Sequence, residues 1–89
     1  MMIRIPTPLR TYTNNQDEVS INGQTVGECL SELCTQYPDL PERIMDSHGQ
    51  LRHFVNAYLN DTNIKSLQTM ETPTTQSDIL SIIPAVAGG

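Results

Sequence analysis

Ile79-Leu80-Ser81-Ile82-Ile83 is a compact apolar run of the length of a β-strand. Alternation along the run places Leu80 and Ile82 on the face expected to meet a hydrophobic core, and Ser81 and Ile83 on the outward face. The run therefore predicts a rigid strand late in the chain. The rest of the sequence predicts further strands and one helix to pack with it.

The tail, Pro84-Ala85-Val86-Ala87-Gly88-Gly89, follows this strand and finishes on two glycines. Glycine has no Cβ, so the last dipeptide is thin, permissive in φ and ψ, and leaves its carboxylate unshielded. Such an end can enter a narrow channel and offer its carboxyl carbon to chemistry performed by another protein. A frayed terminus is the alternative, since chain ends are often poorly ordered. The expected division is a folded domain over residues 1–83 and a flexible tail over residues 84–89.

The composition indicates one small domain with an aliphatic core. The chain has 89 residues, of which 37% are hydrophobic, with one Phe, three Tyr and no Trp. A chain of this length forms a single domain. The formal charge of −5 argues against a nucleic-acid ligand, because neutralising phosphates requires Lys and Arg in number. A protein partner with a basic docking surface is the better expectation.

No stretch of the sequence indicates export or membrane insertion. Arg4 and Pro6 interrupt the N-terminal apolar residues, which are too few for a signal peptide. No apolar run approaches the length of a membrane span. Cys29 and Cys34 match neither a CxxC motif nor a disulfide framework, so a reducing cytoplasm is the expected location.

Two strands near the N-terminus are expected to form an antiparallel hairpin. Met2–Ile5 alternates with period two, and Val19–Ile21 does so after a polar turn cluster at residues 13–17. Pro6 and Pro8 lack the amide hydrogen that a strand uses, so the first strand should become irregular there.

A helix is expected over Val26–Gln36. Thr25 and Glu28 have the spacing of a capping box, and Pro38 ends the helical pattern. Apolar residues recur at helical spacing between these limits and should pack on the sheet. They are Val26, Cys29, Leu30, Leu33 and Tyr37.

The clearest strand is expected over Leu51–Asn60, where alternation is longest. The core-facing residues are Val55, Ala57 and Leu59, and the outward residues include Arg52, Phe54 and Tyr58. Outward aromatic residues on one strand favour a partner surface, although scattered exposed apolar residues are normal.

The remaining segments complete the prediction. Residues 39–50 are expected as a connection, residues 60–63 as a turn, residues 64–70 as a short strand and residues 72–78 as a polar connection. The elements together predict an α+β fold, with a four- or five-stranded sheet and one main covering helix.

The sequence offers no catalytic machinery. His48 and His53 have no third ligand at metal spacing, so a zinc site is not expected. No serine lies in a nucleophile elbow, no glycine-rich loop follows a strand, and the acidic residues form no evident acid–base pair. The Gly89 carboxylate is the distinctive chemical group, so the protein is not expected to be an enzyme or to bind a cofactor itself.

The order of elements and the ending Ile-Ile-Pro-Ala-Val-Ala-Gly-Gly resemble the ubiquitin-like sulfur carriers of the MoaD and ThiS group, and among these the CysO-type carriers of cysteine biosynthesis. The other similar stretches are Ile5-Pro6-Thr7-Pro8-Leu9-Arg10, Glu42-Arg43-Ile44-Met45-Asp46 and Phe54-Val55-Asn56-Ala57-Tyr58-Leu59-Asn60-Asp61. Gln76-Ser77-Asp78 departs from the family, which often has a glycine-containing turn there. The resemblance implies a β-grasp fold with a mixed sheet and a carrier role.

In that family an E1-like enzyme uses ATP to adenylate the terminal glycine carboxylate, which corresponds to Gly89 here. Sulfur then displaces the adenylate and gives a thiocarboxylate. In CysO-type systems this sulfur attacks an aminoacrylate held on a pyridoxal-phosphate enzyme, and a peptidase releases the cysteine. The resemblance implies that ATP, pyridoxal phosphate and any zinc belong to these partners. The residues implied to thread a partner's active site are Ala85, Val86, Ala87 and Gly88.

The resemblance also implies a partner surface. It aligns Ile83 with a position that MoaD-type carriers use at their partner interface. Proximity in the expected sheet adds Phe54, Tyr58 and Arg52 to this surface.

The same C-terminal tail is compatible with other functions. A carrier for molybdopterin or thiamine synthesis would use it in the same way, and a ubiquitin-like modifier would join Gly89 to target lysines. A small adaptor with an incidental tail is a further alternative. The chain length and the stretch at residues 54–61 favour cysteine biosynthesis.

Overall fold

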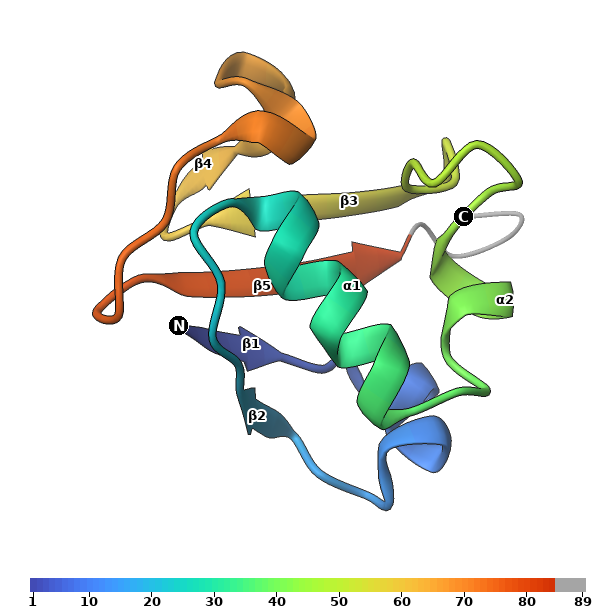
Figure 1. The fold of residues 1–89 in the computed structure, drawn as a ribbon. Coiled ribbons are helices and arrows are strands. Elements are labelled where there is room, and N and C mark those ends of the chain that lie inside the picture. The colour runs from blue at the N-terminus through green and yellow to red at the C-terminus, as the bar shows by residue number, and fades with distance from the viewer. Residues whose placement is uncertain (85–89) are drawn as a thin grey trace.

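The computed structural model describes residues 1–84, and residues 85–89 lie outside the described part. Five strands form one sheet in the order β2-β1-β5-β3-β4, and α1 crosses one face of it (Figure 1). The strands are β1 (Met2–Arg4), β2 (Glu18–Ser20), β3 (Val55–Leu59), β4 (Thr62–Asn63) and β5 (Ile79–Pro84). The α-helices are α1 (Val26–Gln36) and α2 (Pro41–Ile44), and the 3-10 helices are η1 (Thr7–Thr13), η2 (Ile64–Ser66) and η3 (Thr69–Glu71). The predicted α+β class is confirmed.

The strand β5 lies at the centre of the sheet. It runs parallel to β1, with Ile3 opposite Leu80, and antiparallel to β3, with Ala57 opposite Ile82. Leu80 and Ile82 are buried, whereas Ile83 is exposed. The predicted faces of this strand are confirmed, and the sheet is mixed because its two central pairings run in opposite senses.

The helix α1 begins and ends where the sequence predicts. The hydroxyl of Thr25 accepts a hydrogen bond from the Glu28 N–H at 3.1 Å, and the Glu28 carboxylate accepts one from the Gln24 N–H at 3.2 Å. These two bonds satisfy amide groups that have no partner within the helix. The buried residues of the helix are Val26, Cys29, Leu30 and Leu33. Among residues 1–84, no helix is long and apolar enough to cross a bilayer.

The N-terminal hairpin is confirmed, with shifted strand ends. Ile3 pairs with Val19 in antiparallel register, but β2 covers Glu18–Ser20 rather than Val19–Ile21. Ile21 is nevertheless buried, and its N–H donates to the Met1 carbonyl. After β1 the chain turns into η1, which carries Pro8 in its first turn, where a missing N–H costs nothing.

The predicted strand over Leu51–Asn60 is too long. The N–H of Val55 donates to the Arg52 carbonyl at 2.9 Å, so the chain turns immediately before β3. Leu51 makes only an isolated bridge with Met45. The alternation upstream of Val55 therefore has no counterpart in the sheet.

Two further segments differ from the prediction. The fourth strand is Thr62–Asn63, inside the expected turn, because a tight turn at Asn60 returns the chain at once. The side chain of Asn63 then accepts the Lys65 N–H and starts η2, so residues 64–70 form 3-10 turns instead of a strand. The expected connection at residues 39–50 contains α2.

Gly27 provides a test of the packing of α1 on η3. A Cβ at this position would lie 3.0 Å from the Met70 carbonyl oxygen. Helix propensity alone predicts that Gly27→Ala stabilises the protein by about 1 kcal/mol. We expect the close contact to reverse this sign and to lower the free energy of unfolding by about 1 kcal/mol. Urea denaturation measures the change, with Ser31→Ala on the exposed face of α1 as control. A more stable Gly27→Ala protein would contradict the close approach.

Candidate functional site

The tail leaves the sheet from the end of β5, where the strand is held by β3. Ile83 pairs with Asn56, and Pro84 pairs with Val55. The strand thus includes Pro84, one residue beyond the expected domain limit at residue 83. The predicted sulfur-carrying residue Gly89 and the predicted threading residues make up residues 85–89, which lie outside the described residues. The division between domain and tail stays a prediction.

The sheet face opposite α1 carries two of the four predicted partner residues, Tyr58 and Ile83. We call Asn56, Tyr58, Ser81 and Ile83 the open sheet face, because they alternate with the buried core residues of β3 and β5. Ile83 is 48% exposed, and Asn56, Tyr58 and Ser81 are half-buried. Tyr58 lies opposite Ser81, two residues along the strands from the Asn56–Ile83 pair.

Phe54 lies at the same end of the β3–β5 pair as Ile83. It precedes Val55, the partner of Pro84, and it is 41% exposed. The His53 ring packs edge-on against it, with ring centroids 5.6 Å apart and planes at 84°. Two large apolar side chains are therefore exposed close to the exit of the tail, an arrangement typical of a binding surface.

Arg52 is placed differently from the other predicted partner residues. It precedes the turn into β3, so strand alternation does not put it beside Phe54. Its Nε donates to the Glu42 carbonyl at 3.2 Å, and the side chain is half-buried. The structure therefore brings Ile83, Phe54 and Tyr58 to the β3–β5 pair and ties Arg52 to α2.

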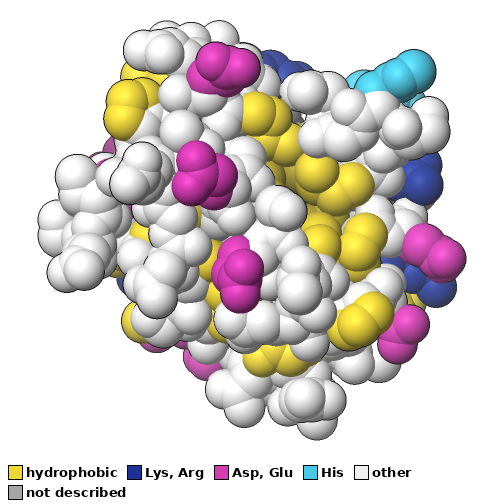
Figure 2. Space-filling view, in the orientation of Figure 1, with side chains coloured by type: hydrophobic (Ala, Val, Ile, Leu, Met, Phe, Trp, Pro, Cys, Tyr) yellow, Lys and Arg dark blue, Asp and Glu magenta, His cyan; other side chains and the backbone are white. Residues whose placement is uncertain are grey.

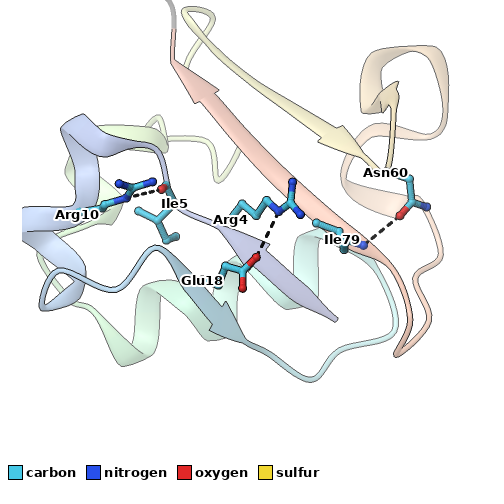
Figure 3. Close-up of polar contacts among 6 residues, drawn as sticks. All are labelled: Arg4, Ile5, Arg10, Glu18, Asn60 and Ile79. Atoms are coloured by element: carbon cyan, nitrogen blue, oxygen red, sulfur yellow. Dashed lines mark hydrogen bonds and ion pairs between the residues drawn. The ribbon is translucent and has the colours of Figure 1, made fainter.

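The far side of the same sheet face is charged. Arg4 of β1 pairs with Glu18 of β2 at 3.3 Å, and both side chains are largely exposed (Figure 3). An exposed pair of this kind contributes at most about 1 kcal/mol to stability. It makes one end of the face polar, while the end near Ile83 is apolar.

Asn60 is a structural residue that the sequence prediction missed. Its amide oxygen accepts the Ile79 N–H at 3.1 Å, and its own N–H donates to the Ile79 carbonyl at 2.7 Å (Figure 3). Its side-chain NH₂ also donates to Asp78 at 3.2 Å. Asn60 adopts the left-handed backbone conformation, with φ 57°. Asparagine tolerates this conformation better than most residues, and Asn14 and Asn15 adopt it as well. The only sequence signal was an asparagine at the start of a turn.

Three titratable groups of the described part have a shifted pKa, and each shift has a structural cause. The backbone N–H groups of Gln50 and His48 lower the pKa of Asp46, and the Thr75 N–H followed by the Asn60 amide lowers that of Asp78. Both carboxylates thus stay ionised as turn caps. Burial raises the pKa of the Cys34 thiol, which makes it a poor nucleophile at neutral pH. Residues 1–84 hold no cluster of three His, Cys, Asp or Glu side chains able to bind a metal.

Comparisons of this sequence with protein families and with individual proteins agree with one another. Residues 3–89 match the ThiS family. The sulfur carrier protein CysO of Mycobacterium tuberculosis is 42% identical over 89 residues, which cover 98% of this chain and 96% of that protein. Small archaeal modifier protein 3 of Haloferax volcanii is 34% identical over 65 residues, which cover 73% of this chain and 70% of that protein.

A solved structure shows the same architecture. A chain in the crystal structure of the Amycolatopsis orientalis BexX/CysO complex superposes with a TM-score of 0.90 at 33% identity, covering 99% of this chain and 98% of that one. The ubiquitin-like β-grasp expectation is therefore confirmed.

Asn60→Gly tests how the start of β5 is held. Glycine keeps the left-handed backbone but loses the side-chain bonds to Ile79 and Asp78. We expect the free energy of unfolding to fall by about 1–2 kcal/mol, measured by urea denaturation. Asn14→Gly is the matched control, because Asn14 has φ 54° and its side chain bonds to none of the described residues. Equal losses in both variants would show that the side-chain bonds of Asn60 contribute nothing.

Proposed function

This chain belongs to the ThiS family, and on that basis we propose that the Gly89 carboxylate is activated by an E1-like enzyme and converted to a thiocarboxylate. Its role is that of a sulfur carrier on which enzymes act, rather than that of a catalyst, as the full-length similarity to CysO supports. The observation that carries the proposal is the central strand β5, which is paired on both sides and ends five residues before Gly89.

The chemistry requires two steps at the terminal carbonyl. A carboxylate is a poor electrophile, so one oxygen attacks the α-phosphate of ATP, and pyrophosphate leaves. A sulfur nucleophile then attacks the acyl adenylate and expels AMP, which leaves sulfur in place of one carboxylate oxygen. We assign both steps to the partner enzyme, because the Cys34 thiol has a raised pKa and the described residues hold no cluster of three metal-ligating side chains that could activate ATP.

Cysteine biosynthesis is the acceptor pathway that we propose. The thiocarboxylate sulfur would attack the aminoacrylate on a pyridoxal-phosphate cysteine synthase and form a new carbon–sulfur bond. A metallopeptidase would then release cysteine and return the carrier. ATP, pyridoxal phosphate and zinc would be held by these partners. The similarity to CysO supports this pathway, and two free cysteines fit a reducing cytoplasm.

The partner would approach along the open sheet face and Phe54. Ile83 and Phe54 are exposed near the exit of the tail, and Tyr58 extends the surface along β3. Ala85, Val86 and Ala87 have short side chains and Gly88 has none, so an extended tail would fit a narrow channel. We keep Arg52 as a candidate rim contact, since it is half-buried and precedes Phe54 closely in the chain. The A. orientalis CysO has been crystallised in a complex with BexX, which supports a partner-bound state for carriers of this kind.

A protein modifier is the second candidate function. The Haloferax volcanii relative carries the name small archaeal modifier protein, and the same adenylated Gly89 could form an isopeptide with a lysine. A carrier for molybdopterin or thiamine synthesis would differ only in the acceptor. Gly89-linked lysine adducts in cell extract would favour the modifier.

Intact mass spectrometry tests the proposal. After incubation with ATP, a sulfide source and the cognate activating enzyme, we expect the full chain to gain the mass difference between sulfur and oxygen. Deletion of Gly89 should abolish this gain, because the carboxylate then lies about 3.5 Å short of the reacting position. Ala87→Gly keeps the length and should still be loaded. Normal sulfur loading of the Gly89-deleted chain would refute the carrier function.

The partner surface is tested by a matched pair of truncations. Ile83 is 48% exposed on the open sheet face, and Leu67 is 43% exposed after η2. We expect Ile83→Ala to raise the KM of the activating enzyme for the carrier by about tenfold or more, since buried apolar anchors dominate interface energetics. Leu67→Ala should leave KM unchanged. An equal effect of both changes would argue against this surface.

A further inference from the structure

A cavity of about 280 Å³ lies on the side of β3 away from β5. One wall is the segment before β3, and the other is formed by the residues that follow β4. Its apolar lining includes Leu51, Val55 and Ile64, and its basic lining consists of Arg52, His53 and Lys65. We call it the basic cavity. Figure 2 shows His, Lys and Arg side chains along the upper right edge of this face, and acidic side chains beside Lys or Arg side chains lower on the same edge.

The charge of the basic cavity is opposite to that of the whole protein. The chain has 10 Asp and Glu residues against 5 Lys and Arg, yet no acidic residue lines the cavity. Elsewhere, Arg4 pairs with Glu18, and Arg43 lies over the Tyr12 ring at 4.9 Å. Lys65 makes no ion pair with the described residues. An apolar pocket with uncompensated cations suits a ligand that has an apolar body and a negative end.

Arg52 is shared between this cavity and its surroundings. Its Nε donates a hydrogen bond to the Glu42 carbonyl. Its charge also helps to lower the pKa of the nearby Asp46 carboxyl. A further shallow pocket on the other side of Arg52 is lined by Glu42 and Asp46. The Lys65 ammonium group and the His53 ring nitrogens are therefore the polar groups of the cavity left for a ligand.

We propose that the basic cavity binds the tail of the same chain, with the Gly89 carboxylate beside Lys65 and His53 and with Val86 against the apolar lining. The tail starts next to the cavity, because Pro84 pairs with Val55, which lines it. Neighbouring strands lie about 4.8 Å apart, so a site beyond β3 is roughly 10 Å from β5. Five extended residues span up to about 17 Å, which is enough to pass around the start of β3.

The chemistry of the tail matches the cavity. Residues 85–87 are Ala-Val-Ala, and the chain ends in a carboxylate. Because the tail is tethered, its effective concentration at the cavity is in the millimolar range, so a weak contact suffices. A docked tail would keep Gly89 from the activating enzyme until the partner displaces it, a consequence that rests on the proposed function, whereas the docking itself does not. The contact should weaken with salt, because a partly exposed ion pair is screened.

NMR on the full chain tests the docking. We compare ¹⁵N-labelled protein that has the free C-terminal carboxylate with the same chain ending in an amide, which keeps the length and removes the charge. We expect the backbone signals of Arg52, His53 and Lys65 to differ between the two forms, and those of Arg4 and Glu18 to coincide. The differences should vanish near 1 M salt, where the Debye length falls to about 3 Å. Identical spectra at low salt would refute the docking.

A charge-matched pair of variants locates the site. Lys65→Gln should remove most of the difference between the carboxylate and amide forms, whereas Arg4→Gln, the same change of charge outside the cavity, should leave it intact. Both side chains are exposed, so the fold should persist. Shifts that appear only when a partner protein is added would assign the cavity to that partner and overturn the proposal. Sulfur loading is measured separately by mass, so loading without these shifts refutes only the docking, and shifts without loading refute only the carrier function.

Discussion

The pairing of β5 with strands on both of its sides is the constraint on which the rest of the structure depends. Leu80 and Ile82 of this strand supply the middle of the core, and the apolar face of α1 covers them. Asn60 holds the first residue of β5, and the pairing of Pro84 with Val55 holds the last. The point and direction at which the tail leaves are consequently set by the sheet, and a rigid departure point lets a partner locate a carboxylate five residues away.

The protein separates its scaffold from its chemistry. The carboxylates with lowered pKa values cap turns, and the half-buried thiol of Cys34 is held in its neutral form. A carrier benefits from this arrangement, because the neutral Cys34 thiol is a poor competitor for an activated carbonyl at its terminus. The surface groups that remain available are the apolar end of the open sheet face, which lies at the end of β5, and the basic cavity, which lies across β3 from that strand.

The parts of the fold that depend on neighbouring residues could be predicted from the sequence. The capping box of α1 and the faces of β5 are local patterns, and both are confirmed. The prediction of a strand before Val55 was wrong, because the alternation of residue types continues through a turn there. The backbone hydrogen bond from the Val55 N–H to the Arg52 carbonyl closes this turn. Asn60 and the basic cavity could not be predicted in this way. Asn60 meets its hydrogen-bond partner Ile79 only when distant segments pack together. The same is true of His53 and Lys65, which line the basic cavity from two separate segments.

The parallel pairing of β1 with β5 has a consequence for the order of assembly. These strands are the first and the last of the chain, and the last one fills the middle of the sheet. During synthesis on a ribosome, the hairpin of β1 and β2 and the pair of β3 and β4 would be complete while the place between them is still vacant. Closing so long a loop is entropically costly and slow. The nascent protein would therefore expose the edges of β1 and β3 until its final strand is released, and this interval is when it is most vulnerable to aggregation.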